Sequence, residues 1–289
     1  MSSDTPHISV VIVTHNSLPA LKDCLAALLR SQVESVLYEI VVVDNASTDG
    51  SADEAERIAP NATVLRLKAN QGFASACDAG ADAADGEYLL FLNPDVIVDP
   101  DALMTLLKVT REYPKAGLVT GRLRFANGEF QATCRQFPTA ANMLLSRGSV
   151  LFQVLGSRVD KQERYTLSEF TGTTEVPAVA AAMVMIRREL FEQLGGFDRR
   201  FFMYMEDTDL SLRVSKQGHV NVFVPEAGGV HLLGEGSAIS QFRRRRLQSL
   251  AVWKYFLKHH PNGFSVILLP ILLTINLCLL AIFPRRREV

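Results

Sequence analysis

The first third of the chain alternates short apolar runs with segments whose apolar residues recur at helical spacing. The runs are rich in Val, Ile and Leu, which is typical of parallel strands buried on both faces. They cover residues 8–14, 39–43, 63–67 and 88–92. Helices are expected between them, at 18–31, after Gly50 and at 74–84. Strands that alternate with helices predict an α/β fold with a mainly parallel sheet flanked by helices.

Polar side chains stand directly after three of the expected strands. They are Thr14, His15 and Asn16, then Asp44 and Asn45, then Asn93 and Asp95. Ligands of open α/β sheets bind beyond the carboxyl ends of the strands, so these residues are candidates for a binding site. The chain has neither a GxGxxG loop nor a GxxxxGK[ST] loop, which argues against a Rossmann dinucleotide site and a P-loop.

Two of these positions offer carboxylates with specific uses. Asp44 is suited to accept hydrogen bonds from a nucleoside. A structural alternative stays open, in which Asp44, Ser47 or Asp49 caps the next helix. Asp95 follows a stiff Asn-Pro pair and is a suitable oxygen ligand for Mg²⁺ or Mn²⁺. The same Asn-Pro-Asp sequence is also typical of a plain turn.

A second acidic cluster, Glu206, Asp207 and Asp209, opens an expected helix at 206–217. The helix dipole favours carboxylates there, which is sufficient reason for Asp209. The aromatic, apolar run at 201–205 would also desolvate a neighbouring carboxylate, which raises its pKa and makes it a better base. His231 falls in an expected glycine-containing loop, where a lone histidine is more often structural than a ligand.

The rest of the second half has weaker patterning. Asn127-Gly128 predicts a hairpin turn, and an apolar run predicts one buried strand at 176–186. Gly195-Gly196 closes a short helix expected at 188–194. A basic helix is expected at 241–259, and residues 135–175 receive no assignment.

Charge and hydropathy distinguish the carboxyl-terminal end. The net charge of -1 gives no general attraction to nucleic acid. Arginine clusters at 243–246 and 285–287 bracket an uncharged stretch at 264–283, which is near the minimum length for crossing a bilayer. A helix lying in one leaflet keeps both clusters on one side, as the positive-inside rule favours. A spanning helix and a buried or homo-oligomer interface helix stay open as alternatives.

Cysteine usage and the amino terminus indicate the compartment. The four cysteines form no CxxC pair, so free thiols in a reducing cytoplasm are expected. The first residues lack the basic and apolar regions of a secretory signal. We therefore expect the protein at the cytoplasmic face of the cell membrane, peripheral or monotopic through its carboxyl terminus.

Five ordered motifs together resemble the family 2 glycosyltransferases of the GT-A fold, over about residues 6–260. The most similar members are rhamnosyltransferase-like bacterial enzymes of cell-wall or O-antigen assembly. The motifs lie at residues 9–16, 39–50, 70–74, 93–95 and 195–213. The resemblance implies an inverting transfer of a sugar from a dTDP- or UDP-linked donor to a lipid-linked saccharide, with Mg²⁺ or Mn²⁺ as cofactor. L-Rhamnose from dTDP-rhamnose is the expected donor.

The resemblance also implies roles for single residues. It makes Asp44 a nucleoside contact, Asp95 the metal-binding end of a DXD-like motif, Asp207 the catalytic base and His231 a late metal or phosphate ligand. The further expected substrate-binding residues are Thr14, Asn16, Asn45, Asn70, Gly72, Asn93, Glu206 and Arg243. Three positions depart from the family pattern. Asn93 replaces an Asp, which leaves the metal with one fewer charge, and Asp78 replaces an Asn. Ala181 replaces a Gly, and its methyl group would narrow the sugar pocket, which leaves the donor sugar open.

The expected organisation has four parts. Residues 1–120 form a nucleotide-sugar-binding half, 121–240 an acceptor-binding and catalytic half, 241–263 the basic helix and 264–289 the apolar membrane-associated segment. Two other functions are weighed against glycosyl transfer. A sugar nucleotidyltransferase would need a glycine-rich basic loop after the first strand, which the chain lacks. An inactive membrane scaffold would have no use for the four implied site residues.

Overall fold

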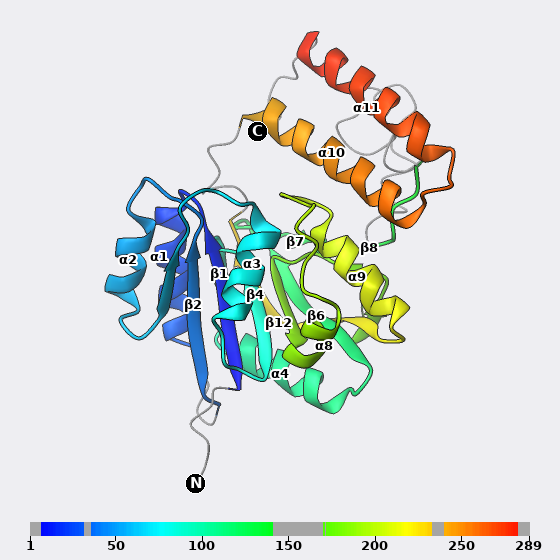
Figure 1. Cartoon of the computed structure of the whole chain (residues 1–289). Coiled ribbons are helices and arrows are strands. Elements are labelled where there is room, and N and C mark those ends of the chain that lie inside the picture. The colour runs from blue at the N-terminus through cyan, green and yellow to red at the C-terminus, as the bar shows by residue number, and fades with distance from the viewer. Residues whose placement is uncertain (1–6, 32–35, 141–169, 171, 233–239, 283–289) are drawn as a thin grey trace.

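The computed structural model describes residues 7–31, 36–140, 170, 172–232 and 240–282 (Figure 1). Within them, ten strands form one sheet with the order β3-β2-β1-β4-β11-β6-β12-β5, to which β7 and β9 add at the side. A separate two-stranded sheet pairs β10 with β8. Helices cover both faces of the large sheet (Figure 1).

The first half follows the expected pattern closely. Its parallel strands are β1 (Ile8–Thr14), β2 (Tyr38–Asp44), β3 (Thr63–Arg66) and β4 (Tyr88–Leu92). Its helices are α1 (Leu18–Leu29), α2 (Ser51–Ile58) and α3 (Phe73–Asp82). Alternate residues of β1 pack on opposite faces, Val10 with α1 and Val11 with α3. The strand is buried on both faces, which explains its continuous apolar run.

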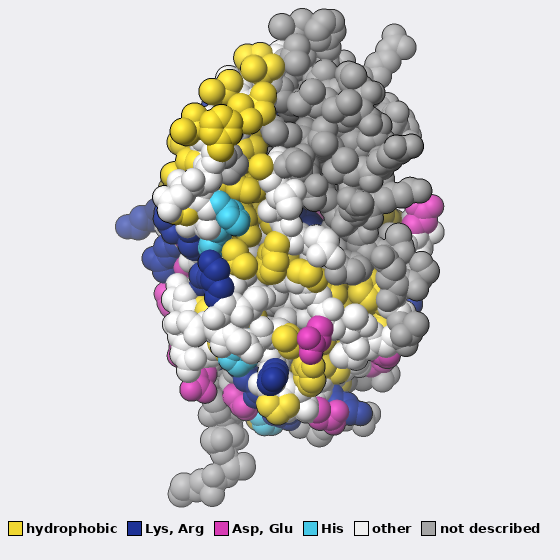
Figure 2. Space-filling view, turned by 90° about the vertical axis from the view of Figure 1, so that its right-hand side faces the viewer, with side chains coloured by type: hydrophobic (Ala, Val, Ile, Leu, Met, Phe, Trp, Pro, Cys, Tyr) yellow, Lys and Arg dark blue, Asp and Glu magenta, His cyan; other side chains and the backbone are white. Residues whose placement is uncertain are grey.

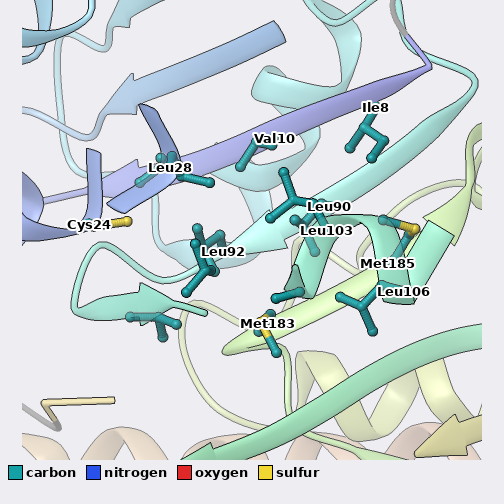
Figure 3. Close-up of a cluster of buried hydrophobic side chains, with 14 of the residues drawn as sticks. Ile8, Val10, Cys24, Leu28, Leu90, Leu92, Leu103, Leu106, Met183 and Met185 are labelled. Carbon is teal, nitrogen blue, oxygen red and sulfur yellow. The ribbon is translucent and has the colours of Figure 1, made fainter. Parts of the chain in front are cut away.

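The second half makes the sheet mixed, so the prediction of a mainly parallel sheet holds only for the first half. After β5 (Val96–Val98) and α4 (Ala102–Glu112), β6 (Ala116–Arg124) enters the sheet. Then β11 (Met183–Arg187) inserts antiparallel between β4 and β6. Figure 3 shows Met183 and Met185 of this strand packed with side chains of β1, β4, α1 and α4. The core therefore joins the two halves.

The predicted single strand at 176–186 is wrong. The structure divides this stretch into β9 (Thr174–Val176), β10 (Ala178–Val179) and β11. Pro177 separates the first two, since proline cannot donate a ladder hydrogen bond. They then pair with different partners, β9 with β12 (Val220–His231) and β10 with β8 (Cys134–Arg135).

The predicted loop around His231 is also wrong, because His231 is the last residue of β12 and pairs with Val96. The glycines before it serve close packing within the sheet. A Cβ on Gly228 would lie 2.6 Å from Asp99 Oδ2, and one on Gly229 would lie 2.8 Å from the Ile97 carbonyl oxygen. Glycine inside a strand often marks such a close approach or a bulge.

The remaining elements match expectation more closely. A turn at Gly128, with φ of +84°, joins β6 to β7 (Phe130–Gln131). The short helix α8 (Arg188–Gln193) ends before Gly195 and Gly196, which both have positive φ. The acidic cluster begins α9 (Glu206–Lys216), which Gly218 follows.

A helical hairpin of α10 (Gln241–His259) and α11 (Ser265–Ile282) ends the described chain. It lies beyond the end of the sheet at which the carboxyl end of β1 is found (Figure 1). Leu269 and Leu273 of α11 share a buried cluster with Tyr255 of α10 and with Phe201. Among the described residues, no helix combines the length and apolar character needed to cross a membrane. The second arginine cluster, 285–287, lies outside the described residues.

Candidate active site

The ends of β1 and β2 place Thr14 and Asp44 side by side, because these residues are partners in the parallel register. Both are buried. Among the described residues, the Thr14 hydroxyl has no hydrogen-bond partner, and the Asp44 carboxylate accepts only from the Ser47 N–H, at 3.2 and 3.3 Å. Both side chains therefore have capacity for a ligand.

The structural role weighed for Asp44 falls on Asp49 instead. Its Oδ1 accepts from the Ser51 N–H at 3.0 Å and from the Ser51 hydroxyl at 2.6 Å, at the start of α2. Its Oδ2 accepts from the Leu18 N–H at 3.0 Å, at the start of α1. Asp49 thus satisfies backbone donors at two helix beginnings, and Asp44 is left for other contacts.

Four of the predicted substrate-binding residues shape the loops of this edge. Asn16 Oδ1 accepts from the Thr48 N–H at 2.8 Å, which joins the loops after β1 and β2. Asn45 Nδ2 donates to Asn70 Oδ1 at 3.1 Å and to the Gly72 carbonyl at 3.2 Å. These contacts give Asn16, Asn45, Asn70 and Gly72 a structural role, and direct contact with a substrate stays a prediction.

Gly72 also connects these loops to the segment before α9. It has a φ of +87°, and a Cβ on it would lie 2.4 Å from the Phe202 carbonyl oxygen. That oxygen accepts from the Phe73 N–H at 2.7 Å. Glycine is required here both for the positive φ and for the close approach of two backbones.

Asp95 and His231 meet where β4 and β12 end, although they are far apart in sequence. Asp95 Oδ1 lies 3.1 Å from His231 Nε2, and the side chains are only 13% and 8% exposed. Gln131 of β7 holds the other ring nitrogen, with its Oε1 3.0 Å from His231 Nδ1. The Asn93 backbone N–H donates to the Ala182 carbonyl at 2.8 Å and fixes the turn that carries Asp95.

This pair could hold a divalent cation if Gln131 Oε1 accepts from Nδ1–H, because the imidazole then presents the lone pair of Nε2 toward a carboxylate oxygen. Two facing acceptors are stabilised by a proton or a cation between them. A metal-bound histidine typically donates its other N–H in this way. No group of three or more His, Cys, Asp or Glu residues suited to a metal occurs among the described residues. Oxygen atoms of a substrate or of water could complete the coordination, as is usual for Mg²⁺.

The start of α9 brings two acids together behind a strained turn. Tyr204 and Met205 both have positive φ, at 71° and 68°, which costs roughly 1–3 kcal/mol for each residue. Glu206 is buried, and its Oε2 has no hydrogen-bond partner among the described residues. Burial, followed by the charge of Asp207, raises the pKa of Glu206 well above its ordinary value. The expected desolvation therefore affects Glu206.

Asp207 is half-buried beside Glu206. Its Oδ1 accepts from the Thr208 N–H at 2.7 Å and from the Thr208 hydroxyl at 3.1 Å. Oδ2 accepts no hydrogen bond within the described part of the chain. The carboxylate is thus oriented by its neighbour while one oxygen keeps its acceptor capacity.

Residues 130–135 connect the Asp95–His231 pair to Glu206 and Asp207. Gln131 contacts His231, and the positive charge of Arg135 acts on Glu206. Neither residue stands out in the sequence, because the pairing of short strands with distant partners leaves little periodicity. A hydrogen-bonding side chain directly after the predicted hairpin turn was the one available signal for Gln131.

Arg243 lies exposed in the first turn of α10, where its N–H donates to the Ser240 hydroxyl at 3.3 Å. The charges of Arg244 and Arg245 act on Tyr204, just before the acids of α9. The basic start of α10 is therefore near the candidate site, and substrate contact by Arg243 itself stays a prediction.

Comparisons with known proteins show the family of the chain. Residues 9–195 match the family described as glycosyl transferase family 2. The N-acetylglucosaminyl-diphospho-decaprenol L-rhamnosyltransferase of Mycobacterium tuberculosis is 33% identical over 247 residues, which are 78% of this chain and 76% of that protein. Rhamnosyltransferase WbbL of Escherichia coli is 31% identical over 150 residues, which are 51% of this chain and 53% of that protein.

Solved structures share the fold at low identity. Mannosyltransferase PcManGT from Pyrobaculum calidifontis, in complex with GDP-Man and Mn²⁺, gives a TM-score of 0.60 at 17% identity over 98% of this chain and 77% of that chain. GalNAc-T7 with UDP, GalNAc and Mn²⁺ gives 0.62 at 18% identity over 87% of this chain, and this chain spans only 48% of its length. The predicted GT-A-like α/β fold is confirmed, and the chain belongs to glycosyl transferase family 2.

Proposed function

We propose that this glycosyltransferase moves L-rhamnose, with inversion, from dTDP-rhamnose to a hydroxyl of a lipid-linked saccharide in cell-envelope glycan synthesis. The observation that carries the proposal is the spatial order of the site. Residues 130–135 connect the Asp95–His231 pair on one side with Glu206 and Asp207 on the other. The relative from Mycobacterium tuberculosis matches 78% of this chain. It is named as an L-rhamnosyltransferase that acts on a diphospho-decaprenol-linked sugar, which supports rhamnose as the donor sugar and a lipid-linked saccharide as the acceptor.

The donor lies across the strand ends. Asp44 and Thr14 offer acceptors to the nucleoside, and Asp95 with His231 would hold Mg²⁺ or Mn²⁺. When bound, such an ion neutralises charge that develops on a diphosphate leaving group. Both solved structures described above contain Mn²⁺ together with a nucleotide or a nucleotide sugar, which supports the choice of metal.

Asp207 acts as general base toward the acceptor. Its carboxylate takes the proton of the acceptor hydroxyl, whose oxygen attacks the anomeric carbon as the bond to the diphosphate breaks. One displacement inverts the configuration at that carbon. Glu206, buried beside it and carrying a raised pKa, binds the acceptor sugar as a hydrogen-bonding neighbour.

A donor screen tests the proposal. With an N-acetylglucosaminyl-diphospho-polyprenol acceptor and Mn²⁺, we expect dTDP release from dTDP-rhamnose to exceed UDP release from UDP-glucose or UDP-GlcNAc by about 100-fold, since a site built for one donor discriminates by its polar contacts. Product stereochemistry by NMR checks inversion. Faster turnover of a UDP-sugar would refute the rhamnose donor, and a retained configuration would refute the single displacement.

The helical hairpin supplies the membrane contact of the proposed enzyme, at the cytoplasmic face. Large apolar side chains of α11 stay exposed along one side of the helix, on the side away from the buried Leu269 and Leu273. They are Ile267, Leu268, Ile271 and Ile275, and Phe264 just before the helix is exposed as well. Hydrophobic side chains gather at the upper end of the view in Figure 2. Exposed arginines at the start of α10 would add attraction to anionic lipids, at about 1 kcal/mol each.

Flotation with vesicles of phosphatidylcholine and phosphatidylglycerol checks this membrane contact. The unmodified protein should float, and the double variant Ile267→Glu, Ile271→Glu should lose most of its flotation, because charge on the apolar face opposes insertion. Leu29→Glu, at an exposed position at the end of α1, is the matched control. Equal flotation of the double variant and the control would rule out α11 as the contact.

A further inference from the structure

The carboxyl end of α10 meets α9 in a cluster of buried charged side chains. Asp209 of α9 is fully buried, and three side chains donate to its carboxylate. Arg213 Nε lies 2.8 Å from Oδ2, Lys258 Nζ lies 2.5 Å from Oδ1, and His259 Nε2 lies 2.7 Å from Oδ1. Lys258 and His259 belong to α10, so the cluster joins the two helices.

Lys258 also holds the segment that leads into α9. Its Nζ lies 2.7 Å from Asp198 Oδ2, and Asp198 is held in turn by Arg200 Nη2 at 2.6 Å. One ammonium group thus bridges a carboxylate before the strained turn and another within the helix. Burial opposes ionisation of Asp209, but the hydrogen bonds of His259 and Lys258 outweigh it and lower its pKa. The cluster therefore stays ionic.

The hydrogen-bond direction at His259 follows from its second partner. Lys216 Nζ lies 3.4 Å from His259 Nδ1. An ammonium group can only donate, so Nδ1 accepts and the ring proton is on Nε2. Nε2–H then donates to Asp209. His259 is oriented from both sides and contributes a fixed donor.

This cluster lies next to two consecutive residues with positive φ, Tyr204 and Met205. Asp207 follows Tyr204 and Met205, whose positive φ persists only where the surroundings fix it. Phe201, before these residues, packs with Val252 and Tyr255 of α10 in one buried cluster. The apolar contacts and the ionic contacts therefore fix both ends of the turn that presents Asp207.

We propose that Lys258 and His259 are positioning residues that act from α10 to hold Asp207 in its reactive orientation. The proposal rests on the proposed role of Asp207 as the base. It makes the hairpin part of the catalytic framework. Loss of either donor should let the start of α9 shift, and a shift of about 1 Å at a reacting group can lower a rate by about 100-fold.

Steady-state kinetics with the full chain test the proposal. Lys258→Met should lower kcat by about 10-fold or more, while the KM for the donor stays within about twofold, because the donor side of the site is untouched. Lys258→Arg should restore most of the loss, since a guanidinium can also bridge two carboxylates. Lys22→Met is the matched control on another helix. Lys22 of α1 also pairs with a carboxylate, Glu54 at 2.9 Å, but within the described residues it does not contact the segment that leads into α9, so kcat should not change.

A double variant separates positioning from a general loss of structure. Lys258→Met added to Asp207→Asn should lower the residual rate no further, because the group that Lys258 positions is already gone. If Lys258→Met lowers kcat by the same factor in both backgrounds, or no more than Lys22→Met does, the positioning role is refuted. Near-normal turnover of Asp207→Asn alone would instead refute the proposed base.

His259 provides a second, independent pair of variants should Lys258→Met fold poorly. His259→Phe removes the donor to Asp209, and His259→Gln retains an N–H donor. We expect His259→Phe to lower kcat with the donor KM unchanged, and His259→Gln to recover most of that loss. Equal rates for the two variants would contradict the role of His259.

Discussion

Replacing Asp207 by asparagine is expected to lower turnover by about 100-fold or more while donor binding stays unchanged. An amide has nearly the same shape but cannot take a proton, and a positioned base contributes about 10²–10⁴-fold. Thr208 can still donate its N–H to the amide oxygen at residue 207, so the start of α9 should keep its structure. The measurement is kcat with saturating donor and acceptor, together with dTDP affinity from calorimetric titration.

Asp53→Asn is the control for this experiment. Asp53 is an exposed carboxylate of α2 whose partner is Arg66 at 2.8 Å, so its loss should leave turnover unchanged. If Asp207→Asn works at nearly the normal rate, Asp207 has no part in the proton transfer. Glu206, its buried neighbour, would then be the next candidate for the base.

Asp95→Ala is expected to weaken dTDP binding by about 100-fold in the presence of Mn²⁺, because the variant loses the carboxylate of the pair with His231. The same variant should respond little to metal removal. EDTA should lower dTDP affinity of the unmodified protein to about the level of the variant. Calorimetric titration with dTDP, with and without Mn²⁺, provides all four values.

Asp99→Asn is a matched control only four residues away. Asp99 pairs with Arg124 at 2.6 Å, and its carboxylate has no hydrogen bond to His231 or Gln131. The affinity of the Asp99→Asn variant for dTDP should keep its full dependence on Mn²⁺. Unchanged affinity and activity of the unmodified protein in EDTA would contradict the proposed metal.

The first half of the fold could be predicted closely because its strands are buried on both faces. The stretch at 8–14 was predicted with the bounds that the structure has, and β2 differs from prediction only by Tyr38 and Asp44 at its ends. Local sequence suffices there, since each strand pairs with a neighbour from the same alternating pattern. The helix α4 was missed, although Leu103, Leu106 and Leu107 recur at helical spacing.

The second half could not be read in the same way, because its pairing depends on residues far apart in sequence. The structural roles of Pro177 and of the glycines before His231 can be assigned only once the strands that pair with them are known. The candidate site shows the same division. Asp44, Asp95 and Asp207 stand out by motif, whereas Gln131 and Arg135 are identified only by what they face in space.

The antiparallel strand β11 also has a consequence for how the chain folds during synthesis. Residues 183–187 fill the position between β4 and β6, so β4 has a free edge until these residues leave the ribosome. Unpaired apolar edges favour aggregation, and contacts over long sequence separation form slowly. The chain between residues 92 and 183 must therefore emerge before the sheet can close. We expect fragments that end before β11 to depend on chaperones for solubility.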